Sequence, residues 1–328
     1  REWIMDFLGS LQATTMAVSK IDAICSMAEV SQSNNYVRPE MSDDGALSIS
    51  DGRHPVIEVL REGSYIPNSL QLDNKQRQLM ILTGPNMGGK STYMRQTALI
   101  SVIAQSGCFV PASSARLGMV DRVFTRVGAH DDLVHGHSTF MVEMLELANI
   151  LRNATPNSLV LLDEIGRGTS TFDGLALAWA VAEQLHAGTG VKTLFATHYH
   201  QLTDVSKILD KSVNCHMQAK EDGHELTLLH RVAEGPTDAS FGIHVAKMAG
   251  VPEEVLERAR KVLNNLEEGS TIEVSKAGPV QSVFSTDFGG RTETKENPVI
   301  DEIKKMDLMN LTPLQALEKL HEIQQKLL

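Results

Sequence analysis

Cysteine, aromatic residues and positive charge are all scarce in this chain of 328 residues. Its three cysteines, Cys25, Cys108 and Cys215, form no C-x-x-C pair, which argues against a disulfide framework or a zinc site and favours a reducing cytoplasm. No apolar run approaches the length of a membrane span. Lysine and arginine number 30 against 41 acidic residues, and the net charge of -11 repels a phosphate backbone. We therefore expect any bound nucleic acid to be held outside this segment.

The N-terminal part of the sequence combines a long helical pattern with a short alternating one. The chain begins at Arg1 rather than at methionine, and we expect it to be a piece of a longer protein. From residue 2 to about 29, apolar side chains recur at a spacing near 3.6, which predicts one amphipathic helix. The run ALSISDGRHPVIEVL (46–60) alternates on both sides of Asp51 and Gly52, and this pattern predicts a β-hairpin.

The middle of the chain, from about 79 to 232, alternates short β-rich runs with helix-like stretches. The predicted strands are LMILT, SLVLLDE, KTLFAT and ELTLLH, and GLALAWAVAEQLHAG is typical of the helices between them. Such alternation predicts an α/β fold in which helices flank a mostly parallel sheet.

The C-terminal part shows a helical pair, a polar stretch and a last amphipathic run. The second helix of the pair, 252–268, carries five acidic and three basic residues, and this net charge of -2 favours protein docking over a DNA groove. The stretch 268–298 is rich in Gly, Ser, Thr and Pro, which predicts a linker. Within it, QSVFSTDF (281–288) faintly resembles motifs that dock on sliding clamps, but its spacing favours chance. The run LTPLQALEKLHEIQQKLL (311–328) predicts a final helix.

The run TGPNMGGKST (83–92) contains a phosphate-binding pattern. It fits G-x-x-x-x-G-K-[ST] with Gly84, Gly89, Lys90 and Ser91, between a predicted strand and a predicted helix. Glycines let backbone N–H groups approach a β-phosphate, Lys90 adds charge near the β and γ oxygens, and Ser91 offers a hydroxyl to Mg²⁺. A flexible glycine turn is the alternative. We expect a nucleotide to contact the loop residues Gly84, Pro85, Asn86, Met87, Gly88, Gly89, Lys90, Ser91 and Thr92.

Two adjacent acids end the predicted strand SLVLLDE. Asp163 follows four apolar residues, and Glu164 comes directly after it. Because adjacent residues of a strand point to opposite faces, Asp163 can reach a Mg²⁺ ion while Glu164 orients the attacking water. The alternative is that both acids cap the following helix.

Two further motifs lie near the same predicted sheet edge. ATHYH follows the strand KTLF and places His198 where a neutral or protonated imidazole could sense a γ-phosphate, although a lone histidine is more often structural. HSTFMVEM (137–144) opens a helix, where Ser138 or Thr139 could cap its own helix or bind a phosphate of another subunit. The residues alone leave both interpretations of Ser138 open.

These motifs, together with FTRVGAHDDL and DEIGRGTSTFDGLALAWA, closely resemble the MutS family of DNA mismatch repair ATPases over residues 1–328. The resemblance implies a P-loop NTPase fold of the ABC type. It also implies a homodimer in which each ATP lies between the phosphate loop of one subunit and a signature helix of the other. On this basis Ser138 acts in trans, and GRGTSTFD (166–173) crosses the dimer interface.

The same resemblance implies roles for four other residues. His198 is expected to be the switch histidine, and Asn86 is expected to contact the γ-phosphate. Tyr65 and His230 match the two rings that stack on the adenine in this family. The alternative for these rings is a half-buried tyrosine and a surface histidine. Lys90, Glu164 and His198 are therefore the expected catalytic residues, and Ser91 and Asp163 the expected metal ligands.

The resemblance also implies how the chain is divided and what it binds. We expect the end of a lever helix at 1–38, an ABC-type ATPase domain at 39–235, a helix-turn-helix dimerisation element at 236–267, a flexible linker at 268–298 and an oligomerisation segment at 299–328. The family's DNA clamp and mismatch-reading domain would precede Arg1. Expected cofactors are ATP and Mg²⁺, and expected partners are mismatched DNA, a MutL-type protein and a second copy. A tetramer formed through the C-terminal helix and a sliding clamp are further options. The expected location is the cytoplasm, at the nucleoid.

Two other functions fit parts of the pattern. One is a nucleotide-gated dimerisation module with little turnover, which the presence of Glu164 disfavours. The other is a different ABC-type ATPase such as a transporter subunit, but the sequence contains no LSGGQ-like signature. We expect a Mg²⁺-dependent ATP hydrolase that switches a mismatch-binding protein to a sliding clamp.

Overall fold

The computed structural model describes residues 2–60, 64–85, 87–126, 138–222, 225–237 and 241–267. Asn86, the predicted linker and the predicted final helix lie outside the described residues. Contacts divide the chain into two units, Arg1–Val251 and Pro252–Leu328. None of the helices within the described residues is both long and apolar enough to cross a membrane.

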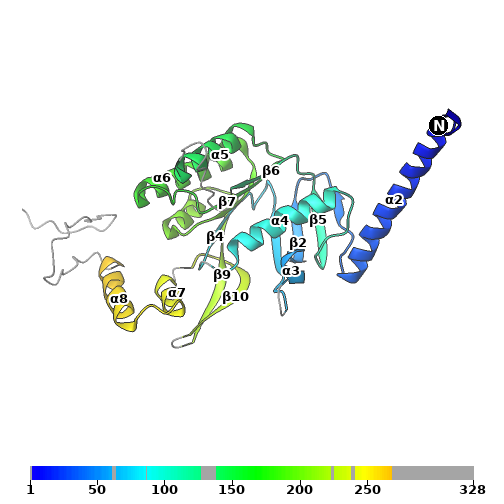
Figure 1. Ribbon diagram of the computed structural model, residues 1–328. Coiled ribbons are helices and arrows are strands. Elements are labelled where there is room, and N and C mark those ends of the chain that lie inside the picture. The colour runs from blue at the N-terminus through cyan, green and yellow to red at the C-terminus, as the bar shows by residue number, and fades with distance from the viewer. Residues whose placement is uncertain are drawn as a thin grey trace, which may run out of the picture. The chain divides into compact units, whose positions relative to one another are not determined.

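The first unit is a mixed α/β structure with two sheets and flanking helices (Figure 1). Its elements, in chain order, are α1 (Glu2–Met5), α2 (Leu8–Ser33), β1 (Glu40–Ser42), β2 (Leu47–Gly52), α3 (Ile57–Leu60), β3 (Asn68–Leu72), β4 (Leu79–Thr83), α4 (Lys90–Gln105), β5 (Ser114–Gly118), β6 (Val123–Arg126), α5 (Thr139–Asn153), β7 (Leu159–Asp163), α6 (Thr171–Glu183), the π-helix η1 (Gln184–Thr189), β8 (Lys192–Ala196), the 3-10 helix η2 (His200–Lys207), β9 (Ser212–Asp222), β10 (Glu225–Glu234) and α7 (Gly242–Met248).

The larger sheet has six strands in the order β10-β9-β4-β8-β7-β6. Every neighbouring pair from β9 to β6 is parallel, and only β10 pairs antiparallel, at one edge. The predicted strands LMILT, SLVLLDE and KTLFAT are therefore confirmed as β4, β7 and β8. Because these three strands are parallel neighbours, their carboxyl ends meet at one edge of the sheet.

Alternating side chains of the larger sheet enter two different hydrophobic cores. In β4, Met80 and Leu82 pack in one core, whereas Leu79 and Ile81 pack in the other. The first core includes α4 and the smaller sheet, and the second includes α5, α6, η1 and η2. Figure 1 shows α4 on one side of the sheet and α5 with α6 on the other. Helices on both faces explain why the central strands are continuous apolar runs.

The smaller sheet, with the order β1-β5-β2-β3, overturns the predicted hairpin at 46–60. β2 pairs antiparallel with β3 and β5, and residues after Gly52 do not return as a strand. Pro55 has no N–H for a ladder, and His54 Nδ1 instead accepts hydrogen bonds from the backbone N–H groups of Val56 and Ile57, both at 3.3 Å. This local capping starts α3 where the alternating pattern predicted a second strand.

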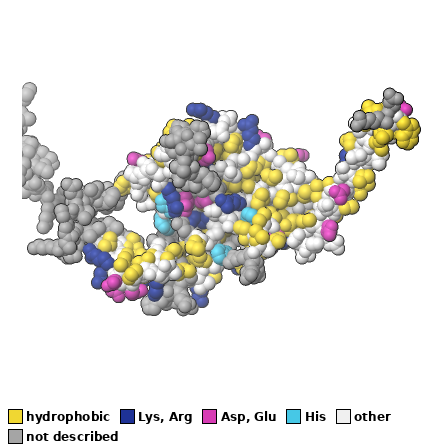
Figure 2. Space-filling view, in the orientation of Figure 1, with side chains coloured by type: hydrophobic (Ala, Val, Ile, Leu, Met, Phe, Trp, Pro, Cys, Tyr) yellow, Lys and Arg dark blue, Asp and Glu magenta, His cyan; other side chains and the backbone are white. Residues whose placement is uncertain are grey.

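The predicted N-terminal helix is present but is divided into α1 and α2. α2 ends in a Schellman motif, in which Asn35 is left-handed (φ 53°) and the Tyr36 N–H donates to Ser31 O at 2.9 Å. None of the α2 residues is buried within the described part of the chain, and Figure 2 shows hydrophobic side chains along this helix.

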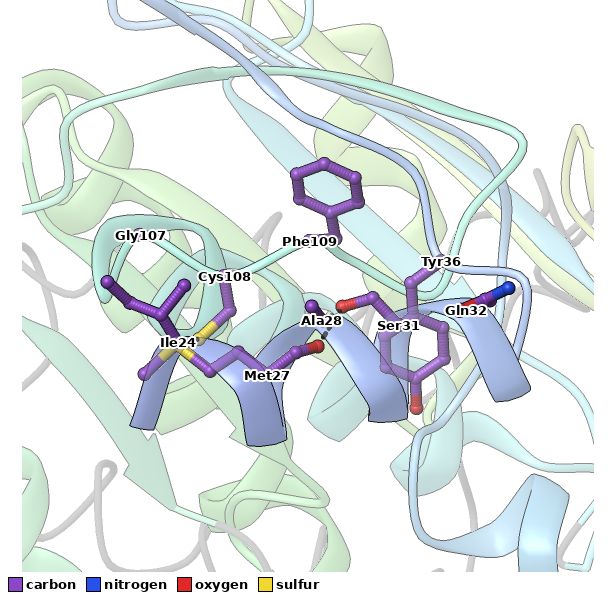
Figure 3. Close-up of a pocket in the computed structure, with 9 residues that line it drawn as sticks. All are labelled: Ile24, Met27, Ala28, Ser31, Gln32, Tyr36, Gly107, Cys108 and Phe109. Carbon is purple, nitrogen blue, oxygen red and sulfur yellow. Dashed lines mark hydrogen bonds between the residues drawn. The ribbon is translucent and has the colours of Figure 1, made fainter. Parts of the chain in front are cut away.

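An apolar cavity of about 340 Å³ lies between α2 and the turn that follows α4 (Figure 3). Ile24 and Met27 line it from α2, and Cys108 and Phe109 line it from the turn. The Met27 Sδ and Cys108 Sγ atoms are 3.5 Å apart. The C-terminal third of α2 thus contacts the rest of its unit mainly through soft apolar side chains.

The described part of the second unit consists of α8 (Glu253–Glu267). Its first turn is acidic, and Arg260 Nη1 forms an ion pair with Glu253 Oε1 at 3.0 Å. The two helices predicted around Gly250 are therefore present as α7 and α8. Their assignment to a dimerisation element stays a prediction.

Candidate functional site

The three strand ends that carry the predicted motifs are joined by backbone hydrogen bonds beyond the strands themselves. The Glu164 N–H, just after β7, donates to Ala196 O of β8 at 2.9 Å. The Thr197 N–H, just after β8, donates to Leu82 O of β4 at 3.0 Å. In the view of Figure 2, basic, acidic and histidine side chains lie close together near the centre. The sheet thus brings the predicted phosphate loop, the two acids and the histidine to one edge.

The loop that follows β4 closely approaches β9. Gly84 has a φ of 124°, and a Cβ placed there would lie 3.1 Å from the backbone N and O of Met217. Gly89, at the start of α4, has a φ of 104°. Only glycine tolerates both the positive φ and this close backbone contact, which is the physical reason for the spacing seen in the sequence. Asn86, the predicted γ-phosphate contact, lies outside the described residues.

Lys90 is the first residue of α4, and its side chain folds back over the loop. Its ammonium donates to Gly84 O at 2.7 Å and to Pro85 O at 3.2 Å. Desolvation lowers the pKa of Lys90, while the negative charges of Glu164 and Asp163 oppose that shift. The cation is therefore held against loop carbonyls at the position where a phosphate would accept the same hydrogen bonds.

Ser91 and Asp163 meet across the site, as the sequence predicted for a metal pair. The Ser91 hydroxyl donates to Asp163 Oδ2. The other carboxylate oxygen, Oδ1, is buried and has no hydrogen-bond partner among the described residues. An orphaned carboxylate oxygen beside a hydroxyl is a donor set that suits a hard cation such as Mg²⁺. The two residues therefore fit the metal that the sequence implied.

Glu164 adopts an unusual backbone conformation directly after β7. Its φ is 56°, a left-handed value that non-glycine residues rarely adopt. Its Oε2 atom forms an ion pair with Arg167 Nη1 at 2.8 Å. Desolvation raises the pKa of Glu164, and Asp163 adds to this, while Arg167 and Lys90 oppose it. The role of Arg167 was missed from the sequence, although it lies in the run GRGTSTFD that core packing could not explain.

His198 stands beside these charges at the end of β8. Burial of the ring, followed by the positive charges of Arg167 and Lys90, lowers its pKa to about 4. Its ring lies 4.0 Å, centroid to centroid, from the ring of Tyr199. Of the two protonation states left open by the sequence, the structure favours a neutral imidazole at physiological pH.

Tyr65 and His230, 165 positions apart in the chain, line one cavity of about 100 Å³. Gly89 and Thr92 of the phosphate-binding run line the same cavity. The Tyr65 hydroxyl donates to Gln96 Oε1 at 2.9 Å. His230 Nδ1 lies 3.1 Å from Gly88 O, so this nitrogen carries the proton that it donates. The two predicted rings and the phosphate loop thus border a common space.

Buried polar side chains that the sequence did not point to hold these rings. Asn68 Nδ2 donates to His230 O at 2.9 Å, and Asn68 Oδ1 accepts from Val232 N at 2.7 Å. Gln96 Nε2 in turn donates to Asn68 O at 3.2 Å.

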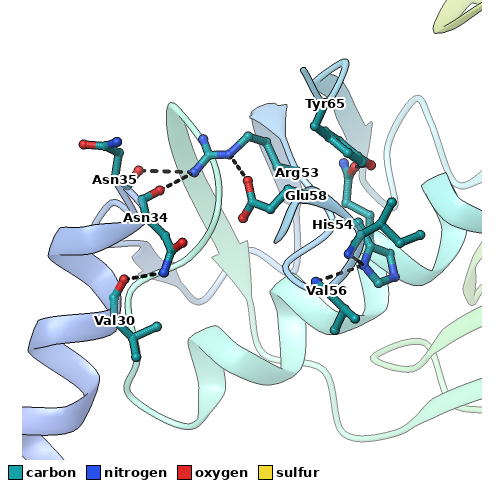
Figure 4. A network of polar contacts seen from close by, with 10 residues as sticks. Val30, Asn34, Asn35, Arg53, His54, Val56, Glu58 and Tyr65 are labelled. Atoms are coloured by element: carbon teal, nitrogen blue, oxygen red, sulfur yellow. Dashed lines mark hydrogen bonds and ion pairs between the residues drawn. The ribbon is translucent and has the colours of Figure 1, made fainter. Parts of the chain in front are cut away.

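A polar network joins the end of α2 to α3, beside this cavity (Figure 4). Arg53 Nη2 donates to Asn34 O at 2.9 Å and to Asn35 O at 3.3 Å. Arg53 Nε donates to Glu58 Oε2 of α3 at 2.6 Å. Ile57, the neighbour of Glu58, lines the cavity that holds the two rings. Arg53 therefore connects the end of α2 to the short helix α3, and α3 also borders the cavity lined by Tyr65 and His230.

Ser138 is the N-cap of α5 in its own subunit. Its Oγ accepts a hydrogen bond from Met141 N at 3.2 Å, and Thr139 is the first helical residue. His137 and the preceding residues from 127 onward lie outside the described residues. The capping role is thus observed, and the predicted role toward another subunit stays a prediction.

Comparisons with known proteins agree with these motifs. A family model described as MutS domain V matches residues 80–267, more than half of the chain. The DNA mismatch repair protein MutS of Methanosarcina mazei is 49% identical over 336 residues, covering 97% of this chain and 37% of that protein. The corresponding proteins of Methanosarcina barkeri and Listeria welshimeri are 50% and 46% identical, over 97% and 100% of this chain. The chain spans less than two fifths of the length of these relatives. The sequence match and the site motifs together show that the chain belongs to the MutS family.

Proposed function

We propose that this chain is the ATP-binding and ATP-hydrolysing part of a mismatch repair protein, with a P-loop fold of the ABC type. The observation that carries the proposal is that Lys90, the Ser91–Asp163 pair and Glu164 meet at one edge of the larger sheet. Membership of the MutS family, whose relatives are named as mismatch repair proteins, supplies the biological context.

In the proposed reaction a water oxygen attacks the γ-phosphorus in line, and the bond to the β–γ bridging oxygen breaks to give ADP and phosphate. Glu164 would orient the water and accept its proton once its carboxylate leaves Arg167. Lys90 would exchange the carbonyls of Gly84 and Pro85 for phosphate oxygens. Ser91 and Asp163 would hold Mg²⁺, which when bound supplies positive charge for the phosphate oxygens.

His198 would act as a neutral hydrogen-bonding group rather than as a second cation. Because its pKa is about 4, the imidazole keeps one N–H donor and one acceptor near pH 7. The N–H of a neutral imidazole can donate a hydrogen bond to a γ-phosphate. Because the ring carries no positive charge, it does not retain the phosphate product by charge attraction. On the basis of the resemblance, Asn86 would contact the same phosphate.

The family relationship extends the proposal to the whole protein. A second copy would supply Ser138 in trans, and ATP binding would switch a mismatch-bound protein to a mobile clamp that signals to a MutL-type partner. Mismatched DNA would be held by segments outside this chain, which agrees with the net charge of -11. The predicted roles of 1–38, 236–267, 268–298 and 299–328 remain proposals on the same basis.

A phosphate-release assay on this chain tests the proposed function. We expect ATP to be hydrolysed in the presence of Mg²⁺ and the rate to fall to background after chelation with EDTA. ATP binding and dimerisation without phosphate release would instead support the alternative of a nucleotide-gated module. ATP binding that is absent with and without Mg²⁺ would contradict the proposal altogether.

Tyr65→Ala should weaken the binding of ATP and ADP while leaving the chemical step unchanged, because a stacking ring contacts any purine face. Loss of an aromatic stack costs roughly 1 to 3 kcal/mol, or about 5- to 150-fold in Kd. Tyr65→Phe is the matched control, since it keeps the ring and removes the hydroxyl that donates to Gln96. Isothermal titration calorimetry with ADP measures both variants. An ADP affinity in Tyr65→Ala equal to that of the parent would remove Tyr65 from the base site.

A further inference from the structure

The backbone N–H and C=O of Gly166, which belong to the two peptide units on either side of its Cα, are each held by a side chain. Its N–H donates to Glu143 Oε1 of α5 at 2.6 Å, in a buried position. Its carbonyl oxygen accepts from the Tyr199 hydroxyl at 3.0 Å, also buried. Burial, followed by the nearby Glu143, raises the pKa of Tyr199, so the hydroxyl keeps the proton that it donates. Two residues that are distant in sequence, Glu143 and Tyr199, therefore fix the two consecutive peptide units that flank the Gly166 Cα.

The backbone at this point needs such support. Glu164 has a φ of 56°, and Gly166 has a φ of 91°. A Cβ on Gly166 would lie 2.6 Å from the Cα of Gly174 in α6, so the loop runs directly against that helix. Left-handed conformations of residues such as Glu164 persist only when their surroundings hold them. Gly166, with its two hydrogen bonds, comes two residues after Glu164, whose carboxylate is proposed to orient the attacking water.

Glu143 is a buried acid with a partner at each carboxylate oxygen: the Gly166 N–H at Oε1 and Arg126 near Oε2. Only 6% of Glu143 is exposed, and its Oε2 lies 3.7 Å from Arg126 Nη2 at the end of β6. Arg126 also pairs with the more exposed Glu146, at 3.1 Å. A buried carboxylate is tolerated when it is paired and hydrogen-bonded, and here the second partner is the Gly166 N–H. Glu143 and Glu146 thus share Arg126, but only Glu143 contacts Gly166 through a hydrogen bond described in this structure.

The positions of the two holding residues connect the separate parts of the site. Glu143 lies in α5, which begins at Ser138, and Tyr199 directly follows His198. Building on the proposed ATPase function, we propose that Glu143 and Tyr199 are positioning residues that hold Gly166, and through it Glu164, in the conformation used to orient water. They act on the chemical step and not on nucleotide affinity, because neither contacts the phosphate loop or the ring cavity through the described contacts.

Glu143→Leu and Tyr199→Phe should each lower kcat by roughly 10- to 100-fold, the size of effect that a small misplacement of a reacting group has. The Kd for ADP should stay within about twofold of the parent value, since the loop at 84–90 is untouched. Glu143→Gln should recover most of the rate, because its amide oxygen can still accept from Gly166 N–H. Glu146→Leu is the matched control: it removes the other carboxylate partner of Arg126 and should turn over like the parent.

Phosphate release, ADP calorimetry and thermal unfolding of these four variants and the parent decide the question. If Glu143→Leu does not fold, Tyr199→Phe carries the test, since it keeps the packed ring and removes one hydroxyl. Turnover in Tyr199→Phe, and in Glu143→Leu where it folds, equal to that of Glu146→Leu and of an active parent would overturn the positioning role alone. A parent that binds ATP and releases no phosphate would overturn the proposed function, and the positioning role with it.

Discussion

Glu164→Ala is expected to stop ATP turnover while leaving ATP binding intact, and Lys90→Ala is expected to abolish binding itself. The two residues lie in one charged group, in which each shifts the pKa of the other. Their contacts differ, however. Lys90 donates to the loop carbonyls at the proposed phosphate position, whereas Glu164 follows the end of β7 and pairs with Arg167. The lysine should therefore act on the ground-state nucleotide and the glutamate on the water.

A group that accepts the proton of an attacking water contributes roughly 10²- to 10⁴-fold to the rate, so kcat of Glu164→Ala should fall by that factor. Filter binding of radiolabelled ATP, measured beside single-turnover phosphate release, separates the two effects. Asp204→Ala is a suitable control, because this acid forms an exposed ion pair with Lys207, and such pairs contribute little. Hydrolysis by Glu164→Ala at the parental rate would show that another group activates the water.

A mixture of two inactive variants is expected to recover about a quarter of the parental activity if Ser138 acts in trans. One variant carries Lys90→Ala with Ser138 intact, and the other carries Ser138→Arg with Lys90 intact. In a two-fold symmetric dimer, the mixed species joins one intact Lys90 to one intact Ser138 and rebuilds one site. Free exchange makes half of the dimers mixed, and each has one of two sites working, which gives roughly a quarter.

The structure sharpens this experiment because Ser138 also caps α5 through Met141 N. Loss of an N-cap typically costs about 1 kcal/mol of stability, so Ser138→Asp, which keeps a capping oxygen, is the control for the helix itself. A role in cis alone predicts no recovery on mixing. Subunit exchange has to be shown first by pull-down of differently tagged chains. Complete exchange with phosphate release at background would leave Ser138 as a helix cap and nothing more.

The sequence was sufficient for those parts of the site that lie at strand ends. β4, β7 and β8 are buried on both faces, so each reads as an apolar run, and the first polar residue after each run marks the sheet edge. Asp163 could be placed in this way, His198 follows the end of β8 by two residues, and Lys90 was placed by the phosphate-binding pattern after β4. Tyr65 and His230 needed the family resemblance, because neither ends a buried strand.

Contacts that depend on distant pairing could not be predicted from the sequence. Asn68 binds the backbone of His230 across 162 positions, and nothing local to either residue indicates the other. Glu143 contacts Gly166 across 23 positions, and nothing local to either residue indicates that contact. The hairpin expected at 46–60 failed for a related reason, since the alternating pattern was correct for β2, but His54 and Pro55 then favour a helical turn.

The Schellman end of α2 has a mechanical consequence. Arg53 fixes that end by donating to the carbonyls of Asn34 and Asn35, whereas the rest of the 26-residue helix buries none of its side chains within the described part of the chain. A helix rises about 1.5 Å per residue, so α2 is roughly 39 Å long. A rotation of about 5° at Asn34 would then sweep the position of Leu8 through an arc of roughly 3 Å. A small angle at the fixed end thus becomes a translation as large as an atom's diameter at the opposite end.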